Sequence, residues 1–109
     1  MNSVVQLRPD QPPRTPPINL EAEQAVLGAL LLWNDLWRDL AIVVKAADFS
    51  EELHRRIFDL AGKMIGDGQT ASPVTLKTFL GEHDLGGVTL PQYLARLAAE
   101  AVSRSSTVA

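Results

Sequence analysis

One apolar helical segment, residues 19–34, constrains the fold more than any other part of the sequence. It reads NLEAEQAVLGALLLWN, and its apolar residues recur at helical spacing from Ala22 and Val26 onward. A helix with so wide an apolar face is mostly interior and needs other helices around it. Asn19 is suited to cap it, because its side-chain oxygen can accept from an unpaired N–H of the first turn. Gly28 costs about 1 kcal/mol relative to Ala in a helix, which suggests that another helix crosses closely there; the alternative is that the glycine is simply tolerated.

Length and composition limit the class of protein. The chain has 109 residues, 46% of them hydrophobic, which is enough for one modest core. It contains no apolar run of about 18 residues, the length that a membrane-spanning helix needs. The N-terminus lacks the basic start and apolar stretch of a secretory signal, and cysteine is absent. We therefore expect a cytoplasmic protein that has no disulfide framework and does not enter a membrane.

A short second helix and a longer third helix follow the first. The second begins at Asn34 or Asp35 and spans about two turns. Its apolar stripe is formed by Leu36, Leu40 and Val43 or Val44. The third helix is the clearest amphipathic one, with Ser50 as its candidate cap and residues 66–68 as its end. Its polar side is expected to carry His54, Arg55, Arg56, Asp59 and Lys63.

Two more helices complete the expected fold. Ser72 and Pro73 have the form of a cap followed by a first helical position. The buried residues of this fourth helix are expected to be Val74, Leu76 and Leu80, with Phe79 left open. Thr89 and Gln92 have the form of a capping box before a fifth helix. Because we find no strand alternation and no repeat, we predict an all-α fold, a compact bundle of about five short helices.

The chain divides into three regions by pattern. Residues 1–18 hold five of the seven prolines and are expected to be a disordered leader, because proline propagates neither helix nor strand. Two PxxP spacings occur there, but a proline-rich leader is more often only a leader. Residues 19–102 hold the all-α domain. Residues 103–109 are small and polar and are expected to fray.

Motifs that would carry catalysis are missing. The string GDGQTA at residues 66–71 matches a dinucleotide fingerprint, but it follows a helix instead of a strand and precedes Pro73, so we interpret it as accidental. No GxxxxGK[ST] loop is present to hold ATP. His54 and His83 stand apart without the spacing of metal ligands, and no serine lies in a GxSxG elbow. We predict no catalytic residue, no cofactor site and no metal site in this chain.

The charge balance argues against nucleic-acid binding. Ten Lys and Arg stand against thirteen Asp and Glu, a formal net charge of −3, whereas a free-standing nucleic-acid binder usually carries a basic excess. A helix-turn-helix remains a third alternative, formed by the helix from Pro73, the turn at Gly86 and Gly87, and the helix from Leu90. Its weakness is that Arg96 is the one cation that the second helix offers to phosphates up to residue 102.

Five sequence blocks occur in one order between residue 16 and about residue 100. They are PPINLEAEQAVLGALLL, ADF, HRRIF, a Pro-Val-Thr-Leu helix start, and LGG followed by YLARLA. In this combination the chain resembles the N-terminal domain of the bacterial replicative DNA helicase family DnaB. The resemblance implies a small all-α head domain in the collar of a homohexameric ring, which self-associates and takes part in binding primase. It also implies that ATP and Mg²⁺ belong to a C-terminal motor domain that is absent from these residues.

Four residues are candidates for partner contacts. Trp33 ends the first apolar helix, where so short a chain can hardly cover it, and it stands where the family commonly has an acidic residue. Trp37 lies one helical step from the stripe that begins at Leu36, so it is expected to be at least partly core. Arg55 and Arg56 could reach carboxylates of a neighbouring subunit, because Arg offers a bidentate fork; the alternative is a solvated face with local ion pairs.

We interpret the chain as a protein-interaction domain and not as an enzyme. The expected partners are further copies of the chain and the helicase-binding domain of primase, with no direct duplex DNA binding. The second reading is a free-standing α-helical adaptor or regulator with the same fold, and the third is the small DNA-binding module.

Overall fold

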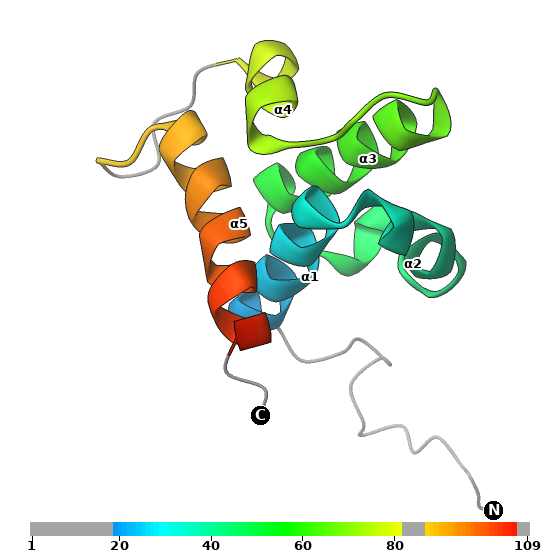
Figure 1. Cartoon of the computed structure of the whole chain (residues 1–109), viewed down its shortest axis with the longest axis horizontal. Helices are drawn as coiled ribbons and strands as arrows, with labels where there is room; N and C mark the ends of the chain where they lie inside the picture. Colours follow the sequence, from blue (N-terminus) through cyan, green and yellow to red (C-terminus); the bar gives the residue numbers. More distant parts are fainter. Residues whose placement is uncertain (1–18, 82–86, 107–109) are drawn as a thin grey trace, which may run out of the picture.

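The computed structural model describes residues 19–81 and 87–106, and most of these residues are helical (Figure 1). The helices are α1 Leu20–Leu32, α2 Trp37–Val43, α3 Glu52–Gly66, α4 Pro73–Leu80 and α5 Leu90–Ser106. Single turns of 3-10 helix, Asn34–Leu36 and Ala46–Asp48, connect α1 to α2 and α2 to α3. The described residues form no strand, so the predicted all-α fold of about five short helices is confirmed. The leader, His83 and Gly86 lie outside the described residues.

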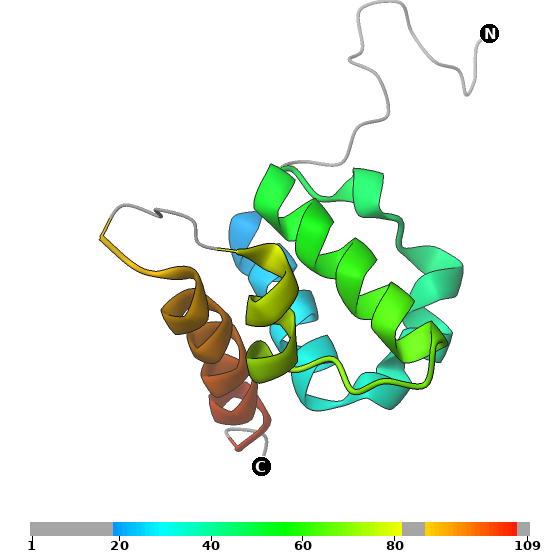
Figure 2. The ribbon, with the colours of Figure 1, turned by 90° about the horizontal axis from the view of Figure 1, so that it is seen from above.

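Helix α1 lies between α3 and α5, and it packs most extensively against α5 (Figures 1 and 2). The short helix α4 rests on α5 and α3, while α2 lies beside α3. The largest fully buried side chains are Leu27, Leu30, Ile57, Leu76, Leu90, Leu94 and Leu97. They come from α1, α3, α4 and α5, so one core joins four of the five helices, as the apolar spacing of the first helix requires.

The close crossing expected at Gly28 is confirmed. A Cβ atom built there would lie 2.1 Å from the carbonyl oxygen of Leu97 on α5. Gly62 likewise leaves space for a close neighbour, the indole of Trp37. A Cβ atom at Gly62 would lie 2.3 Å from that ring. The Trp37 ring also lies 5.1 Å from the ring of Phe58, which confirms that Trp37 is partly core.

Three predicted helix starts are confirmed. Asn19 Oδ1 accepts from a backbone N–H of the first turn of α1 at 3.0 Å. Ser72 caps α4, with Pro73 at the first helical position. At α5 the N–H of Thr89 donates to Gln92 Oε1 at 3.0 Å, and the N–H of Gln92 donates to the Thr89 hydroxyl at 3.3 Å. Each of these contacts joins residues three apart, so local sequence is sufficient to specify it.

The predicted cap of α3 is wrong. Helix α3 begins at Glu52, and Glu51 occupies the cap position without a side-chain hydrogen bond. Ser50 instead donates its N–H (2.9 Å) and its hydroxyl (2.7 Å) to the Glu23 carboxylate on α1. The Ser50 hydroxyl therefore donates its proton to a side chain of α1 and does not cap α3.

Helices α4 and α5 correct two further predictions. The predicted burial of Val74 is wrong, because Val74 is 67% exposed; Phe79, for which the sequence leaves burial open, is 63% exposed. The reason is that the buried residues of α4 are Leu76 and Leu80, on another face of the helix. Helix α5 continues past residue 102 to Ser106, so the part of the expected frayed tail up to that residue is helical. A pair at i, i+4, Arg104 with Glu100 at 3.7 Å, supports this last part of the helix.

The connection from α3 to α4 is held to the end of α1 by one side chain. Asn34 Nδ2 donates to the carbonyl oxygens of Leu30 and Ala71, both at 2.9 Å. Asn34 Oδ1 accepts from the N–H of Ala71 at 2.9 Å. Ala71 is fully buried, so Asn34 supplies hydrogen bonds to a backbone segment that water does not reach.

Candidate functional site

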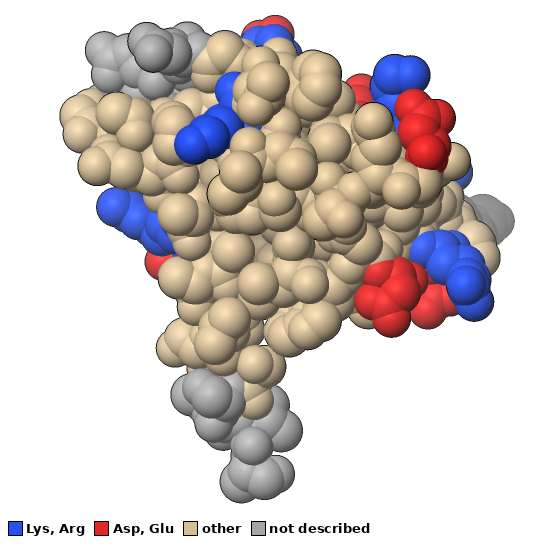
Figure 3. All heavy atoms as spheres, turned by 45° about the horizontal axis from the view of Figure 1, so that its top comes forward, with Lys and Arg blue, Asp and Glu red and all other residues tan. Residues whose placement is uncertain are grey.

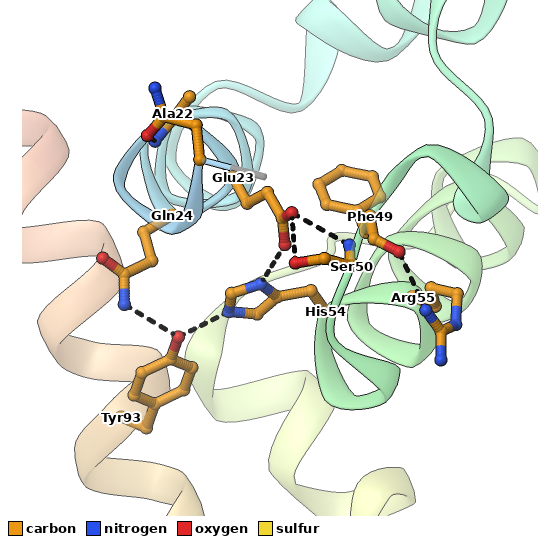
Figure 4. Close-up of polar contacts among 9 residues, drawn as sticks. Ala22, Glu23, Gln24, Phe49, Ser50, His54, Arg55 and Tyr93 are labelled. Atoms are coloured by element: carbon orange, nitrogen blue, oxygen red, sulfur yellow. Dashed lines mark hydrogen bonds and ion pairs between the residues drawn. The ribbon is translucent and has the colours of Figure 1, made fainter. Parts of the chain in front are cut away.

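A buried histidine lies where three helices meet (Figure 4). His54 of α3 is 3% exposed, and its Nδ1 lies 2.7 Å from Glu23 Oε1 on α1. Its Nε2 lies 2.5 Å from the Tyr93 hydroxyl on α5. The prediction that His54 lies on a solvated face is wrong, because partners on α1 and α5 replace the water that a buried imidazole needs.

Two more side chains extend these contacts. Gln24 Nε2 donates to the Tyr93 hydroxyl at 3.2 Å, and Ser50 donates to Glu23 as described above. The rings of His54 and Tyr93 stack with centroids 6.0 Å apart and planes within 10°. We call Glu23, Gln24, Ser50, His54 and Tyr93 the polar cluster. It ties α1, α3 and α5 together in addition to the apolar core.

The surroundings of Glu23 and of Tyr93 each favour one protonation state. Burial by itself raises the pKa of Glu23, but hydrogen bonds from His54 and Ser50 outweigh it, so that this pKa lies below its ordinary value. Burial raises the pKa of Tyr93, and the nearby carboxylates of Glu51, Glu100 and Glu23 add to the increase. At neutral pH Glu23 is therefore a carboxylate and Tyr93 a neutral phenol, which makes Tyr93 a hydrogen-bonding group and a poor nucleophile.

The polar cluster borders a surface hollow of about 360 Å³. Gln24, His54 and Tyr93 line it from the cluster side. The other lining residues are the apolar Leu20, Leu53 and Val88 and the charged Glu51 and Arg96. A hollow with an apolar lining and a few convergent polar groups is suited to receive a side chain of a partner protein.

The four residues predicted for partner contacts have different environments. Trp33 is 42% exposed, so the expectation that so short a chain does not cover it is confirmed, while its role in association stays a prediction. Trp37 packs against Gly62 and Phe58, as described above. Arg55 Nη1 donates to the carbonyl oxygen of Phe49 at 2.8 Å, so its guanidinium is partly engaged within the chain. Arg56 is exposed.

The structure does not bring these candidates together into one site. Arg55 and Arg56 belong to the part of α3 that meets Glu23 in the first turn of α1. Trp33 follows the other end of α1, and a rise of 1.5 Å per residue puts about 15 Å between that end and Glu23. A partner that contacts one end of α1 alone can therefore reach Trp33 or the two arginines, but not both.

The local sequence pattern does not predict the polar cluster. It places His54 on a polar helix face, Ser50 at a helix cap, and Glu23 near the positive end of a helix dipole. The partners of His54 are 31 and 39 residues away, so no local spacing connects them. The one available signal was a histidine next to the apolar Leu53 within a strongly amphipathic helix.

The described residues contain neither a group suited to bind a metal ion nor a helix suited to span a membrane. No group of three or more His, Asp or Glu residues within 19–81 and 87–106 is arranged to hold a metal ion. No helix in that part of the chain is long and apolar enough to cross a membrane.

Comparisons with known proteins agree with the resemblance. The family profile described as "DnaB-like helicase N terminal domain" matches residues 15–109. A replicative DNA helicase DnaB of Rickettsia conorii is 36% identical over 86 residues, which cover 78% of this chain and 17% of that protein. The DnaB of Buchnera aphidicola is 39% identical over 85 residues, covering 77% and 18%. That of Pasteurella multocida is 32% identical over 111 residues, covering 98% and 23%.

The chain thus spans between 17% and 23% of the length of these relatives. The family profile nevertheless covers nearly all of its patterned sequence, including every helix described above. The chain belongs to the family of DnaB-like helicase N-terminal domains.

Proposed function

We propose that this chain is the protein-interaction domain of a DnaB-like replicative helicase that acts in DNA replication in the cytoplasm. In this function the domain contributes to association of helicase subunits in a collar and contacts primase. ATP hydrolysis and strand translocation belong to the remainder of the longer protein. The proposal is supported by the names of the relatives, which are replicative DNA helicases, and by the match to the profile of a DnaB-like helicase N-terminal domain.

The observation that carries the proposal is apolar surface on two consecutive elements. Trp33 follows α1, and at the end of α2 Ile42 and Val43 are 74% and 72% exposed. Apolar area left in water is unfavourable by about 25 cal/mol per Å², and tryptophan often anchors association surfaces. Figure 3 shows one face of the molecule, on which Lys, Arg, Asp and Glu lie mainly near the edge and other residues, polar and apolar, form the centre. We propose that Trp33, Ile42 and Val43 belong to one association surface, which we call the corner surface.

Sedimentation equilibrium tests the corner surface. The wild-type chain is compared with Trp33→Asp, alone and with the helicase-binding domain of a primase, and circular dichroism verifies that helicity is unchanged. Val74→Asp is the matched control, because it places the same charge at another exposed apolar residue, on α4. We expect Trp33→Asp to weaken self-association or primase binding, and Val74→Asp to leave both unchanged. If wild type, Trp33→Asp and Val74→Asp sediment alike, both alone and with the primase domain, the corner surface is not an association surface.

A further inference from the structure

The hollow beside Tyr93 has a negative electrostatic environment. Of the lining residues, Glu51 and Arg96 carry opposite charges, while Glu23 stands behind His54 as a carboxylate. Glu100 also acts on Tyr93, although it pairs with Arg104 at 3.7 Å. With a neutral His54, the carboxylates that surround the Tyr93 hydroxyl outnumber the cations. Such a site favours a positively charged occupant.

The hydrogen bonds of Tyr93 leave one acceptor position unused. A phenolic oxygen has one O–H to donate and two lone pairs that accept. When His54 is neutral, its Nδ1–H donates to Glu23 and its Nε2 accepts the Tyr93 O–H. One lone pair of Tyr93 accepts from Gln24, and the second is available to a donor that enters the hollow. The occupant that this hydroxyl matches is therefore a donor.

We propose that this hollow binds a Lys or Arg side chain of a partner protein. The ammonium or guanidinium group would donate to the second lone pair of Tyr93 and pair with Glu51. Leu20, Leu53 and Val88 would cover the aliphatic stem, as apolar residues commonly do for long basic side chains. The volume of about 360 Å³ is at the lower end of the range of ligand pockets, roughly 300 to 1,000 Å³.

NMR titration of the full chain with n-butylammonium, a mimic of the lysine side chain, tests the proposal. Butyrate is the anionic counterpart with the same number of carbon atoms. The variants are Glu51→Gln and Tyr93→Phe, and Glu52→Gln is the matched control, since it makes the same charge change at the next residue, which does not line the hollow.

We expect n-butylammonium to shift the amide signals of Leu20, Leu53 and Val88 with a saturable curve, and butyrate to leave them unchanged. Glu51→Gln should weaken the affinity by about two- to fivefold, as for a solvent-exposed ion pair, while Glu52→Gln has no effect. Tyr93→Phe should weaken it as well. Equal effects of Glu51→Gln and Glu52→Gln, or equal binding of butyrate, would overturn the proposal.

This test is independent of the proposed function. It measures a side-chain mimic on one copy of the chain and involves neither subunit association nor primase. A failure here leaves the corner surface unaffected, and a failure of the corner surface leaves the hollow unaffected.

Discussion

Replacement of Gly28 by Ala tests the packing of α1 against α5. On the present backbone the new Cβ would lie 2.1 Å from the Leu97 carbonyl oxygen and 3.4 Å from the Ala101 Cβ. The first distance is far below an ordinary contact, and the atom it meets is backbone, which cannot rotate away. The two helices must therefore separate locally by about 1 Å.

The expected loss of stability follows from two opposing contributions. Overpacking of a close contact costs about 1 to 3 kcal/mol, and a backbone obstacle places this case in the upper half of that range. Ala in place of Gly within a helix returns about 1 kcal/mol. The net loss in the free energy of unfolding is about 1 to 2 kcal/mol, which lowers the Tm by roughly 4 to 16 °C for a domain of this size.

Urea and thermal unfolding followed by circular dichroism measure this change. Gly66→Ala, at the last residue of α3, is the matched control, because a Cβ there has no neighbour within 4 Å. The control should be as stable as wild type or gain up to about 1 kcal/mol. The reasoning is refuted if Gly28→Ala unfolds at the same urea concentration as wild type or at a higher one.

Four further predictions follow, three on single side chains and one on the whole chain. Asn34→Leu should lower the free energy of unfolding by about 1 to 3 kcal/mol, because it leaves the buried backbone of Ala71 without hydrogen-bond partners. Asp35→Asn, the control, should change this free energy little. Urea unfolding measures both variants. The pKa of Glu23 is lowered from 4.5, so its contribution to stability is present above that pH and lost as pH falls through the folded-state pKa; Glu23→Gln should unfold with a flatter acid dependence than wild type. The pKa of Tyr93 is raised from 10.0, so stability should fall as pH rises above that value in wild type and less so in Tyr93→Phe. Finally, the isolated chain should neither hydrolyse ATP nor bind duplex DNA, and a salt-sensitive complex of micromolar affinity in a fluorescence titration would contradict this.

Local sequence patterns were sufficient to predict the helices and most of their ends. Apolar spacing located α1, α3 and α5, and the caps at Asn19, Ser72 and Thr89 were predicted correctly. These features depend on residues three or four positions apart, so a single stretch of sequence contains all the information that they need. Gly28 likewise indicated a close helix crossing, although the sequence could not name Leu97 as the residue opposite.

Which polar groups are buried and which apolar groups remain in water depends on how the helices pack. His54 is buried because Glu23 and Tyr93 reach it from two other helices, and Ser50 leaves its expected cap because the same carboxylate accepts from it. Val74 is exposed because the packing of α4 against its neighbours leaves that face uncovered. Burial of a polar group is favourable only when distant partners satisfy its hydrogen bonds, and the positions of such partners depend on how the helices pack, which no local pattern in the sequence records.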